Sequence, residues 1–514
     1  MKHMNEKFYI TTPIYYVNDK PHIGHAYTTI LADVLSNYNE IFGKQTYFLT
    51  GTDEHGQKVE SAAKEKNISP IEHCNETVIR FQDLWNKLGI SNDDFIRTTE
   101  ERHTNVVKLV LQELFDRGEI YKGEYKGWYC VSSERFLTEK DLTDESSPDY
   151  GRPVESIVES NYFFKMSKYQ DWLIDYIEKN SNFIQPDFRA NETLGFLKSK
   201  KLQDLCISRP KTRLGWGIDL PFDKDFVTYV WFDALINYIS SIGFKSDSKK
   251  FESLWPCECH LIGKDILTTH TVYWPIMLKA MGLDLPKTIF AHGWWLTGKT
   301  KMSKSLGNVV NPMDMIEKYD VDSFRFFLLS EMTLGQDASF TEEAFIRRYN
   351  ADLANDLGNL LNRVLNMIHR YCDSKIPMHH YFEQEEKNLW INLQQSISFM
   401  NESVLNMKIH LGIEKIMDVV RSINKYLEIK APWTAYKNDC KNDVETTLYT
   451  ASECLRAVAD ILLPIMPCKM SIVRKSFGIT YKSENFDKID EFGQLPSNTK
   501  ISQPEVLFPR IEVN

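Results

Sequence analysis

The first fifty residues alternate between extended and helical patterns, and this alternation restricts the possible folds more than any other feature of the chain. Residues 8–17, FYITTPIYYV, are rich in β-branched and aromatic side chains, which is typical of a strand. The next segment carries apolar side chains at helical spacing, namely Ala26, Ile30, Val34, Tyr38 and Ile41. A second strand-like run, TYFLT, then precedes the turn GTDEHG. This order of strand, helix and strand predicts a parallel α/β sheet.

Polar residues stand where both predicted strands end. His22, Gly24 and His25 follow the first strand, and Asp53 follows the second. Ligands bind at the carboxyl ends of parallel strands, and a helix N-terminus attracts phosphate. Gly24 lets a flat base approach the backbone, while imidazoles donate hydrogen bonds to phosphate oxygens. The alternative for so short a pattern is a pair of surface histidines in a loop.

A second segment suited to phosphate lies near residue 300. The run TGKTKMSKSLGNVV places Lys299, Lys301 and Lys304 among small residues, which allow a loop to close over a ligand. One such loop is usually only a solvated basic segment. Two phosphate-suited segments, each in a sensible context, together favour a nucleotide site.

Composition limits the class of protein. The chain has 514 residues, enough for three or four folding units, and 71 acidic against 61 basic side chains give a net charge of −10. This balance argues against a general nucleic-acid coat but permits a local basic face. The nine cysteines are scattered, which indicates reduced thiols in a cytoplasmic protein. We find no signal-peptide core and no run approaching the ~20 apolar residues of a membrane span.

Several longer motifs carry a family resemblance. HIGH at residues 22–25 and KMSKS at residues 301–305 resemble the paired signatures of class I aminoacyl-tRNA synthetases. The segments TTPIYYVND, LTGTDEHGQK, SRPKTRLGWGI, TYVWFDALINY and HLIGKDILTTHTVYWP are similar to the methionyl-tRNA synthetase family within that class. The resemblance runs from about residue 8 to residue 433 and more faintly beyond.

The resemblance implies an α/β fold with four parts. These are a Rossmann-type parallel-sheet catalytic domain (residues 5–115 and 226–294), an inserted connective domain (116–225), a KMSKS-loop domain (295–350) and a C-terminal α-helical bundle that binds the anticodon (351–514). No additional dimerising module is expected, so the resemblance predicts a monomer.

The resemblance also implies a reaction. The family condenses L-methionine with ATP, accompanied by Mg²⁺, to methionyl-adenylate and pyrophosphate, and transfers the methionyl group to the 3′ end of tRNA(Met), including the initiator. His22 and His25 would serve ATP and the transition state, and Lys301 and Lys304 would hold the pyrophosphate. ATP binding would also involve Gly24 and Asp265; the alternative for Asp265 is a helix N-cap.

Methionine is flexible and apolar, so its site should present aromatic faces and few polar groups. Asp53 would bind the ammonium group, although it could instead cap the turn before Glu54. For the aromatic residues the alternative is ordinary core packing. The expected methionine-binding residues are Ile14, Tyr16, Asp53, Trp231, Ala234, Leu235, Tyr238 and His270.

Many relatives carry a zinc knuckle in the insert, and this chain departs from that pattern. Cys130 keeps one ligand position, whereas Ser133, Ser147 and Tyr150 occupy the others. Neutral Ser and Tyr are poor zinc ligands, so we predict no structural zinc. The insert is also too short for the editing domains of larger class I enzymes.

From Thr341 onward the pattern is helical. Asn355, Asn359 and Arg363 recur at i, i+4 and i+8 and form a polar stripe, which is usually just solvated. In the family these positions and Trp433 match residues that read the anticodon. Asn and Arg bind base edges, and Trp stacks on an unpaired base. The alternative for Trp433 is a core anchor at a helix end.

Two other functions remain open from the sequence. One is a nucleotidyltransferase that uses the same histidine motif on a different acceptor, although such enzymes are usually small and lack the lysine loop. The other is a tRNA-binding relative that has lost catalysis. The presence of His22, His25, Lys301 and Lys304 argues against it.

Overall fold

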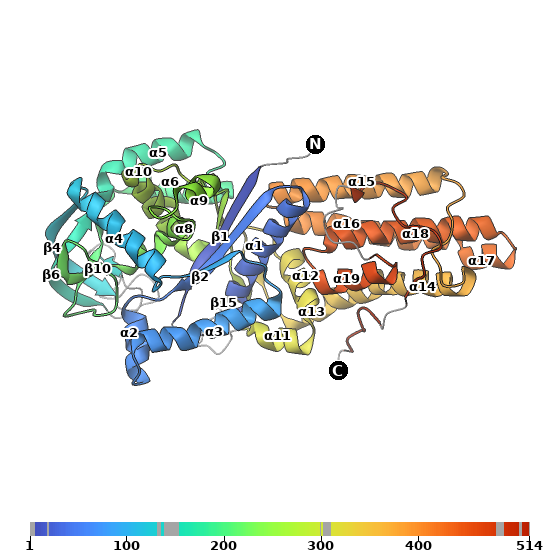
Figure 1. Ribbon diagram of the computed structural model, residues 1–514, viewed down its shortest axis with the longest axis horizontal. Coiled ribbons are helices and arrows are strands. Elements are labelled where there is room, and N and C mark those ends of the chain that lie inside the picture. Colours follow the sequence, from blue (N-terminus) through green and yellow to red (C-terminus); the bar gives the residue numbers. More distant parts are fainter. Residues whose placement is uncertain are drawn as a thin grey trace.

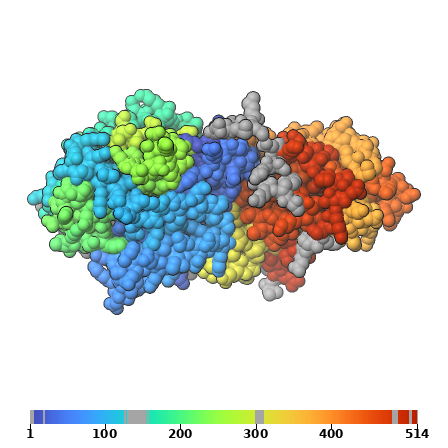
Figure 2. All heavy atoms as spheres, viewed as in Figure 1, coloured from blue at the N-terminus to red at the C-terminus, as the bar shows by residue number. Residues whose placement is uncertain are grey.

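The computed structural model describes residues 6–17, 20–130, 135–137, 154–298, 300–301, 310–479, 488–502 and 506–512. An α/β half contains the first described strands and helices, and a bundle of long helices forms the other half (Figure 1). The two halves make one elongated body, with the orange and red residues at one end (Figure 2). None of the helices in these ranges combines the length and hydropathy needed to cross a lipid bilayer.

The α/β half is built on a six-stranded sheet of Rossmann type, which confirms the predicted class. All five neighbouring pairs are parallel; for example, Ile10 lies opposite both Phe48 and Cys259. The strands, in sheet order, are β3 (Asp94–Arg97), β2 (Gln45–Asp53), β1 (Lys7–Tyr16), β12 (Cys259–Gly263), β13 (Thr288–His292) and β7 (Ile184–Gln185).

The helix after β1 begins directly at the histidine motif. Its burial differs from the predicted amphipathic pattern, because both the sheet and the helical half cover it: fourteen of its nineteen residues are buried. Ala26, Ile30, Val34 and Tyr38 are buried as predicted, whereas Ile41 is only partly covered. The helices that accompany the first strands are α1 (Ile23–Ile41), α2 (Gln57–Glu65), α3 (Pro70–Leu88) and α4 (Glu101–Asp116).

The segment after α4 forms small sheets but also completes the central one. Strand β7 extends the central sheet by pairing Ile184 with Ile289, and Phe183 and Ile184 are buried in the same apolar cluster as Ile289. One antiparallel sheet contains β4 (Ile120–Cys130), β5 (Arg135–Leu137), β6 (Glu155–Phe164) and β8 (Leu205–Cys206), and a second contains β9 (Ser208–Pro210), β10 (Asp219–Leu220) and β11 (Asp223–Thr228). The helices of this segment are η2 (Met166–Tyr169), α5 (Gln170–Lys179) and α6 (Asp187–Ser199).

Short helices then connect the last strands of the sheet. Before and after β12 lie α7 (Val230–Leu235), α8 (Asn237–Ser240), α9 (Ser248–Leu254), η3 (Lys264–Ile266), η4 (Thr269–Tyr273) and α10 (Trp274–Met281). After β13 come β14 (Trp295–Thr297), β15 (Thr300–Lys301), α11 (Pro312–Lys318), α12 (Val321–Glu331), β16 (Ala338–Ser339) and α13 (Glu342–Arg348).

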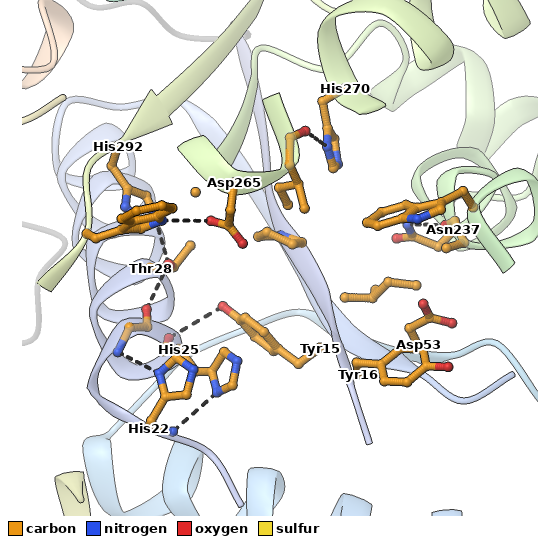
Figure 3. Close-up of a pocket in the computed structure, with 18 of the residues that line it drawn as sticks. Tyr15, Tyr16, His22, His25, Thr28, Asp53, Asn237, Asp265, His270 and His292 are labelled. Atoms are coloured by element: carbon orange, nitrogen blue, oxygen red, sulfur yellow. Dashed lines mark hydrogen bonds between the residues drawn. The ribbon is translucent and has the colours of Figure 1, made fainter. Parts of the chain in front are cut away.

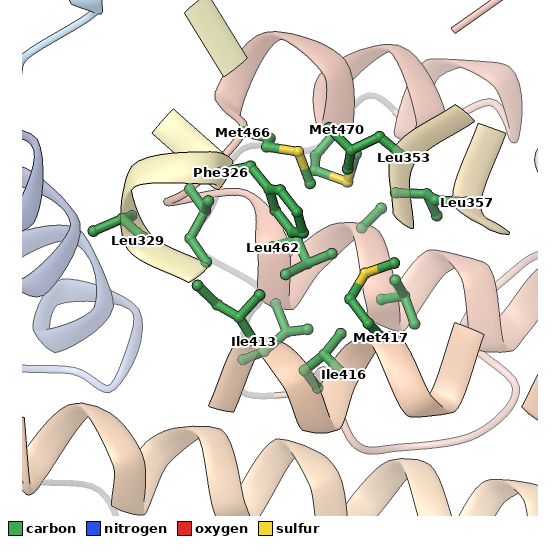
Figure 4. Close-up of a cluster of buried hydrophobic side chains, with 14 of the residues drawn as sticks. Phe326, Leu329, Leu353, Leu357, Ile413, Ile416, Met417, Leu462, Met466 and Met470 are labelled. Atoms are coloured by element: carbon green, nitrogen blue, oxygen red, sulfur yellow. The ribbon is translucent and has the colours of Figure 1, made fainter. Parts of the chain in front are cut away.

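The C-terminal half is helical, as predicted, but its first ten residues form a π-helix. This π segment is η6 (Tyr349–Gly358), and it continues into α14 (Asn359–Tyr371). The remaining helices are α15 (Gln384–Leu405), α16 (Ile409–Lys430), α17 (Pro432–Lys437), α18 (Lys441–Leu462) and α19 (Pro467–Ser476). Figure 4 shows part of the core they share with α12, where Phe326 lies among Leu462, Met466 and Met470.

A buried ion pair ties the two halves together. The guanidinium of Arg325, on α12, lies 2.6 Å from the carboxylate of Asp33, on α1, and both side chains are 1% exposed. Arg325 also donates to the carbonyl oxygens of Leu88, Pro464 and Ile465. Removing either partner would leave a buried charge unpaired, so this contact fixes α1 against the helical half.

The final described segments pack back on the helical half. The carboxylate of Glu453 accepts the backbone N–H groups of Gln494 and Leu495. Asn350 exchanges two hydrogen bonds of 2.8 and 2.9 Å with the backbone of Ile511, and the Tyr349 hydroxyl donates to the carbonyl of Pro509. Residues 506–512 therefore hold the beginning of η6.

Candidate active site and tRNA surface

A cavity of about 440 Å³ opens at the carboxyl ends of β1, β2, β12 and β13 (Figure 3). This is the sheet edge at which ligands were expected. The cavity brings together twelve of the predicted site residues, which are Ile14, Tyr16, His22, Gly24, His25, Asp53, Trp231, Ala234, Leu235, Tyr238, Asp265 and His270.

His22 and His25 form a rigid pair at the start of α1. The Nδ1 of His22 accepts the backbone N–H of Gly24 at 3.0 Å, and the backbone N–H of His22 donates to Nδ1 of His25 at 3.2 Å. Since each Nδ1 is an acceptor, each neutral ring carries its proton on Nε2. Burial, with a smaller contribution from His22, holds the pKa of His25 well below its usual range. The pair therefore offers neutral N–H donors.

One side of the cavity contains Asp265 and Trp294. The Asp265 carboxylate accepts the indole N–H of Trp294 at 3.1 Å. Asp265 is not an N-cap, because η3 begins at Lys264 and Gly263 precedes it. The ammonium of Lys264 lies 4.0 Å from the centre of the Trp294 ring and 2.7 Å from Asp337. These contacts orient the Asp265 carboxylate.

The sequence did not predict a second contact on this side of the cavity, between Thr28 and His292. The hydroxyl of Thr28 lies 3.0 Å from the carbonyl oxygen of Gly24 and 2.7 Å from Nε2 of His292. Nδ1 of His292 donates to the carbonyl of Gly293 at 2.7 Å, and burial lowers the pKa of His292. The run AHGWW, at the end of β13, could have predicted this contact, because ligands bind at the carboxyl ends of parallel strands and β13 is one of them. The missed lining residues include Thr28, Asn237, His292, Trp294 and Trp295.

The opposite side of the cavity is mainly apolar. Ile14, Trp231, Ala234 and Leu235 line it, and Asp53 lies beside Tyr16 (Figure 3). The hydroxyl of Tyr238 donates to Nε2 of His270 at 2.8 Å, because Nδ1 of His270 donates to the carbonyl of Ile266. Burial lowers the pKa of His270 to about 4, so its imidazole is neutral near pH 7.

A buried network behind this wall fixes α7. The carboxylate of Asp233 lies 2.6 Å from Nδ1 of His55 and 2.7 Å from Nε2 of His103. Nδ1 of His103 lies 2.8 Å from the hydroxyl of Ser240. Although burial raises the pKa of Asp233, His55 and His103 lower it below its usual value. The network joins α7, which carries Trp231, to the end of β2.

The structure describes only part of the lysine loop. The backbone of Lys301 ends β15 opposite Leu296 of β14, and the neighbouring Trp295 lines the cavity. The loop therefore starts from a strand that borders the cavity. The Lys301 side chain and Lys304 lie outside the described residues.

The prediction that the protein binds no structural zinc concerns four positions that the structure does not describe in full. Ser133, Ser147, Tyr150 and the side chain of Cys130 are also outside the described residues. Among the residues that are described, three acidic side chains could together hold a metal ion, Glu383, Glu385 and Glu386 in the helical half. Glu386 already binds the Tyr426 hydroxyl and Lys430, so these contacts account for its buried charge.

The predicted polar stripe lies on the surface of η6 and α14. Asn355 and Asn359 are exposed and Arg363 is half-buried. The Arg363 guanidinium lies 5.9 Å from the centre of the Trp433 ring and donates to Glu428. Ala431 adopts φ +40° after α16, and Pro432 begins α17, so Trp433 sits at a corner and is half-buried. The structure thus brings together Arg363 and Trp433.

Two family models match the chain. One, described as tRNA synthetases class I (M), matches residues 8–150 and 141–365, and the other, described as the anticodon binding domain of methionyl tRNA ligase, matches residues 376–514.

Individual relatives agree with these models. The chain is 43% identical to the methionine–tRNA ligase of Halalkalibacterium halodurans, over all of this chain and 80% of that protein. It is also 43% identical to that of Bacillus subtilis, over all of this chain and 79% of that protein. A Mycobacterium tuberculosis methionyl-tRNA synthetase in complex with methionyl-adenylate superposes with a TM-score of 0.94 and 37% identity, covering 98% of this chain and all of that one. The chain belongs to the methionyl-tRNA synthetase family of class I aminoacyl-tRNA synthetases.

Proposed function

We propose that this protein is a methionine–tRNA ligase that activates L-methionine with ATP and transfers the methionyl group to tRNA(Met). The observation that carries the proposal is the composition of one cavity. It holds the neutral histidine pair at one side and an apolar wall with the Asp53 carboxylate at the other. A phosphate-bearing substrate and a methionine side chain would therefore meet inside it.

In the activation step, a methionine carboxylate oxygen attacks the α-phosphorus of ATP and pyrophosphate leaves. Negative charge builds on the phosphate oxygens, and donors fixed in advance stabilise it without reorganising. The Nε2–H groups of His22 and His25 would act there, with Lys301 and Lys304 on the departing pyrophosphate. Gly24 would let the nucleotide approach the backbone, and Asp265 would bind its ribose.

Mg²⁺ would accompany ATP and neutralise part of the phosphate charge. This ion usually keeps several waters and binds substrate phosphates plus one or two carboxylates. Asp265 and Asp53 are the carboxylates in the described lining of the cavity. A few carboxylates are enough for an ion that arrives with its nucleotide, and no cage of acidic residues is needed.

Methionine would bind along the apolar wall. Its thioether and methylene groups would contact Ile14, Trp231, Ala234 and Leu235, and Asp53 would pair with its ammonium group. The Tyr238 hydroxyl and the neutral His270 ring lie together at this wall. A neutral imidazole suits an uncharged side chain better than a cation would.

In the transfer step, a hydroxyl at the 3′ end of the tRNA attacks the methionyl carbonyl and AMP leaves. The helical half would select the tRNA. Asn355, Asn359 and Arg363 would bind base edges of the anticodon, and Trp433 would stack on one unpaired base. The contact between Arg363 and Trp433 supports this role, because it places a donor and a stacking surface side by side.

Further features belong to the same proposal. They are the four domain boundaries expected from the sequence, a monomeric state, a cytoplasmic location, the absence of structural zinc and inclusion of initiator tRNA among the acceptors. Light scattering, elemental analysis and charging of purified initiator and elongator tRNA test three of them directly.

The test of the activity is pyrophosphate exchange into ATP with each of the twenty amino acids, without tRNA. We expect exchange with methionine alone. Exchange driven by a different amino acid would reject the assignment of the pocket. Folded protein that exchanges with none of them, with Mg²⁺ present, would favour a tRNA-binding relative without catalysis.

A further inference from the structure

A second aromatic pair joins the same two helices, α14 and α17, as the contact between Arg363 and Trp433. Tyr371, at the end of α14, stacks on Tyr436 of α17, with ring centroids 4.3 Å apart and planes 25° apart. Tyr436 is nevertheless 50% exposed. Since Tyr371 covers one face of the Tyr436 ring, much of this exposed area belongs to its other face and its edge.

Both contacts join the same two helices, α14 and α17. Along α14, Arg363 and Tyr371 are eight residues apart, which corresponds to about 12 Å. On α17, Trp433 and Tyr436 are three residues apart and share a face. Helix α17 lies at the end of the helical half that is farthest from the sheet (Figure 1), and these contacts place it beside α14.

The chemistry of this surface fits unpaired RNA better than it fits a protein core. Exposed Arg370 and Lys437 adjoin the two tyrosines in the sequence and are suited to phosphate. Exposed Asp373 and Asp439 follow closely. The local charge is therefore mixed and does not by itself indicate RNA. The feature that indicates a stacked base is the open face of the Tyr436 ring. Every nucleobase can stack on such a face.

We propose that Tyr436, supported by Tyr371, is a second stacking platform for an unpaired base of the tRNA anticodon loop, beside the one proposed for Trp433. This inference rests on the proposed function. Stacking on tyrosine tolerates every base, so the platform contributes affinity and holds the loop in position. Identity of the anticodon would still be read by the neighbouring polar stripe.

The first experiment measures binding of an RNA hairpin that reproduces the anticodon arm of tRNA(Met), at one fixed salt concentration. We expect Tyr436→Ala to weaken binding about 5- to 100-fold. Tyr436→Phe, which keeps the ring, should bind within about twofold of wild type. The matched control is Phe399→Ala, which removes a ring of similar exposure (39%) on α15. Methionine-dependent pyrophosphate exchange should be unchanged in all three variants.

The second experiment identifies the stacked base and separates stacking from packing. Each loop base of the hairpin is removed in turn, and we expect the effect of Tyr436→Ala to disappear at one abasic position. An equal loss at every position, together with a lower melting temperature, would assign Tyr436 to packing and overturn the proposal. Wild-type affinity of Tyr436→Ala, or no binding of the hairpin by the wild-type protein, would also overturn it.

Two further outcomes are distinguishable. If Tyr436→Ala does not fold, Tyr436→Leu replaces it, because leucine keeps an apolar contact with Tyr371 and lacks a stacking face. If the wild-type protein binds the hairpin but shows no exchange with methionine, the proposed catalytic function fails. The abasic scan then decides the platform independently.

Discussion

The rings of His22 and His25 lie face to face, with centroids 3.8 Å apart and planes 19° apart. Two positive charges at this separation would repel each other strongly. The backbone instead supplies an N–H group to each Nδ1, which fixes the neutral form with the proton on Nε2. Burial of His25 acts in the same direction. The pair is therefore built to donate hydrogen bonds without carrying charge.

Replacing His22 by asparagine separates its two roles. Asparagine is a good N-cap and can accept the Gly24 N–H, so α1 should keep its start and the melting temperature should change little. The imidazole donor is lost, and pyrophosphate exchange should fall by about 10²-fold. His369→Asn, on the exposed end of α14, is the control and should exchange normally. An unchanged rate for His22→Asn would remove this residue from the reaction.

Asp53→Asn tests the recognition of the methionine ammonium group. The variant keeps the shape of the side chain and removes its charge, so the KM for methionine in the exchange assay should rise at least about tenfold. The KM for ATP should stay the same. Asp83→Asn, an exposed position on α3, should change neither constant. Equal rises in both constants would indicate a general disturbance of the cavity.

Asp233→Asn tests the network behind α7. Neutralising a carboxylate that is 0% exposed and binds two histidines should lower the free energy of unfolding by about 3 kcal/mol. Because α7 carries part of the apolar wall, the KM for methionine should also rise. Urea unfolding and exchange kinetics measure the two effects. Asp225→Asn, exposed on β11, should be neutral in both.

Buried histidines should make the protein sensitive to acid. Burial lowers the pKa of His25, His260, His270 and His292, so the unfolded chain binds protons near pH 6.5 that the folded protein does not. Their contribution is present above about pH 6.5 and is lost as the pH falls. For His270, with a pKa of about 4, the loss approaches about 3 kcal/mol at that pH.

Urea unfolding at pH 7.5, 6.5 and 5.5 measures this loss. His270→Gln should show a shallower fall of the free energy of unfolding with pH than wild type. Asp322 acts in the opposite direction, because burial raises its pKa to about 6 and its charge destabilises the fold above that pH. A free energy of unfolding that rises steadily on acidification would contradict the assignment of neutral histidines.

Trp433→Ala distinguishes anticodon contact from packing. If Trp433 stacks on a base, charging of tRNA(Met) should lose about 10- to 100-fold in kcat/KM while exchange stays intact. Because the ring also contacts Arg363, the melting temperature is measured alongside. Full charging with a lower melting temperature would assign Trp433 to packing.

Strand ends were the most informative part of the sequence. The run FYITTPIYYV predicted β1, and the rule about carboxyl ends placed His22, Gly24, His25 and Asp53 in one cavity. Position along the strand could not predict which side chains pair, such as Thr28 with His292, because those residues are 264 positions apart. The sequence also did not predict that β7 joins the central sheet, because a strand of two residues is too short to show an alternating pattern.

The π segment shows a different limit. A helical pattern of apolar residues predicts burial of Leu353 and Leu357, and both are buried. Their spacing of four residues fits one face of an α-helix equally well, so the sequence predicts an α-helix where the structure has a π-helix. Contacts with the distant Pro509 and Ile511 are features that local spacing does not contain.

Those contacts give the helical half an order of assembly. Pro509 follows Tyr349, which it contacts in η6, by 160 positions in the chain, and Ile511 follows Asn350 by 161. A chain interrupted before residue 506 already contains every residue that lines the cavity. It lacks the segment that holds the start of η6, from which the polar stripe extends. During synthesis, therefore, the cavity proposed for methionine and ATP can be complete before the surface proposed for tRNA.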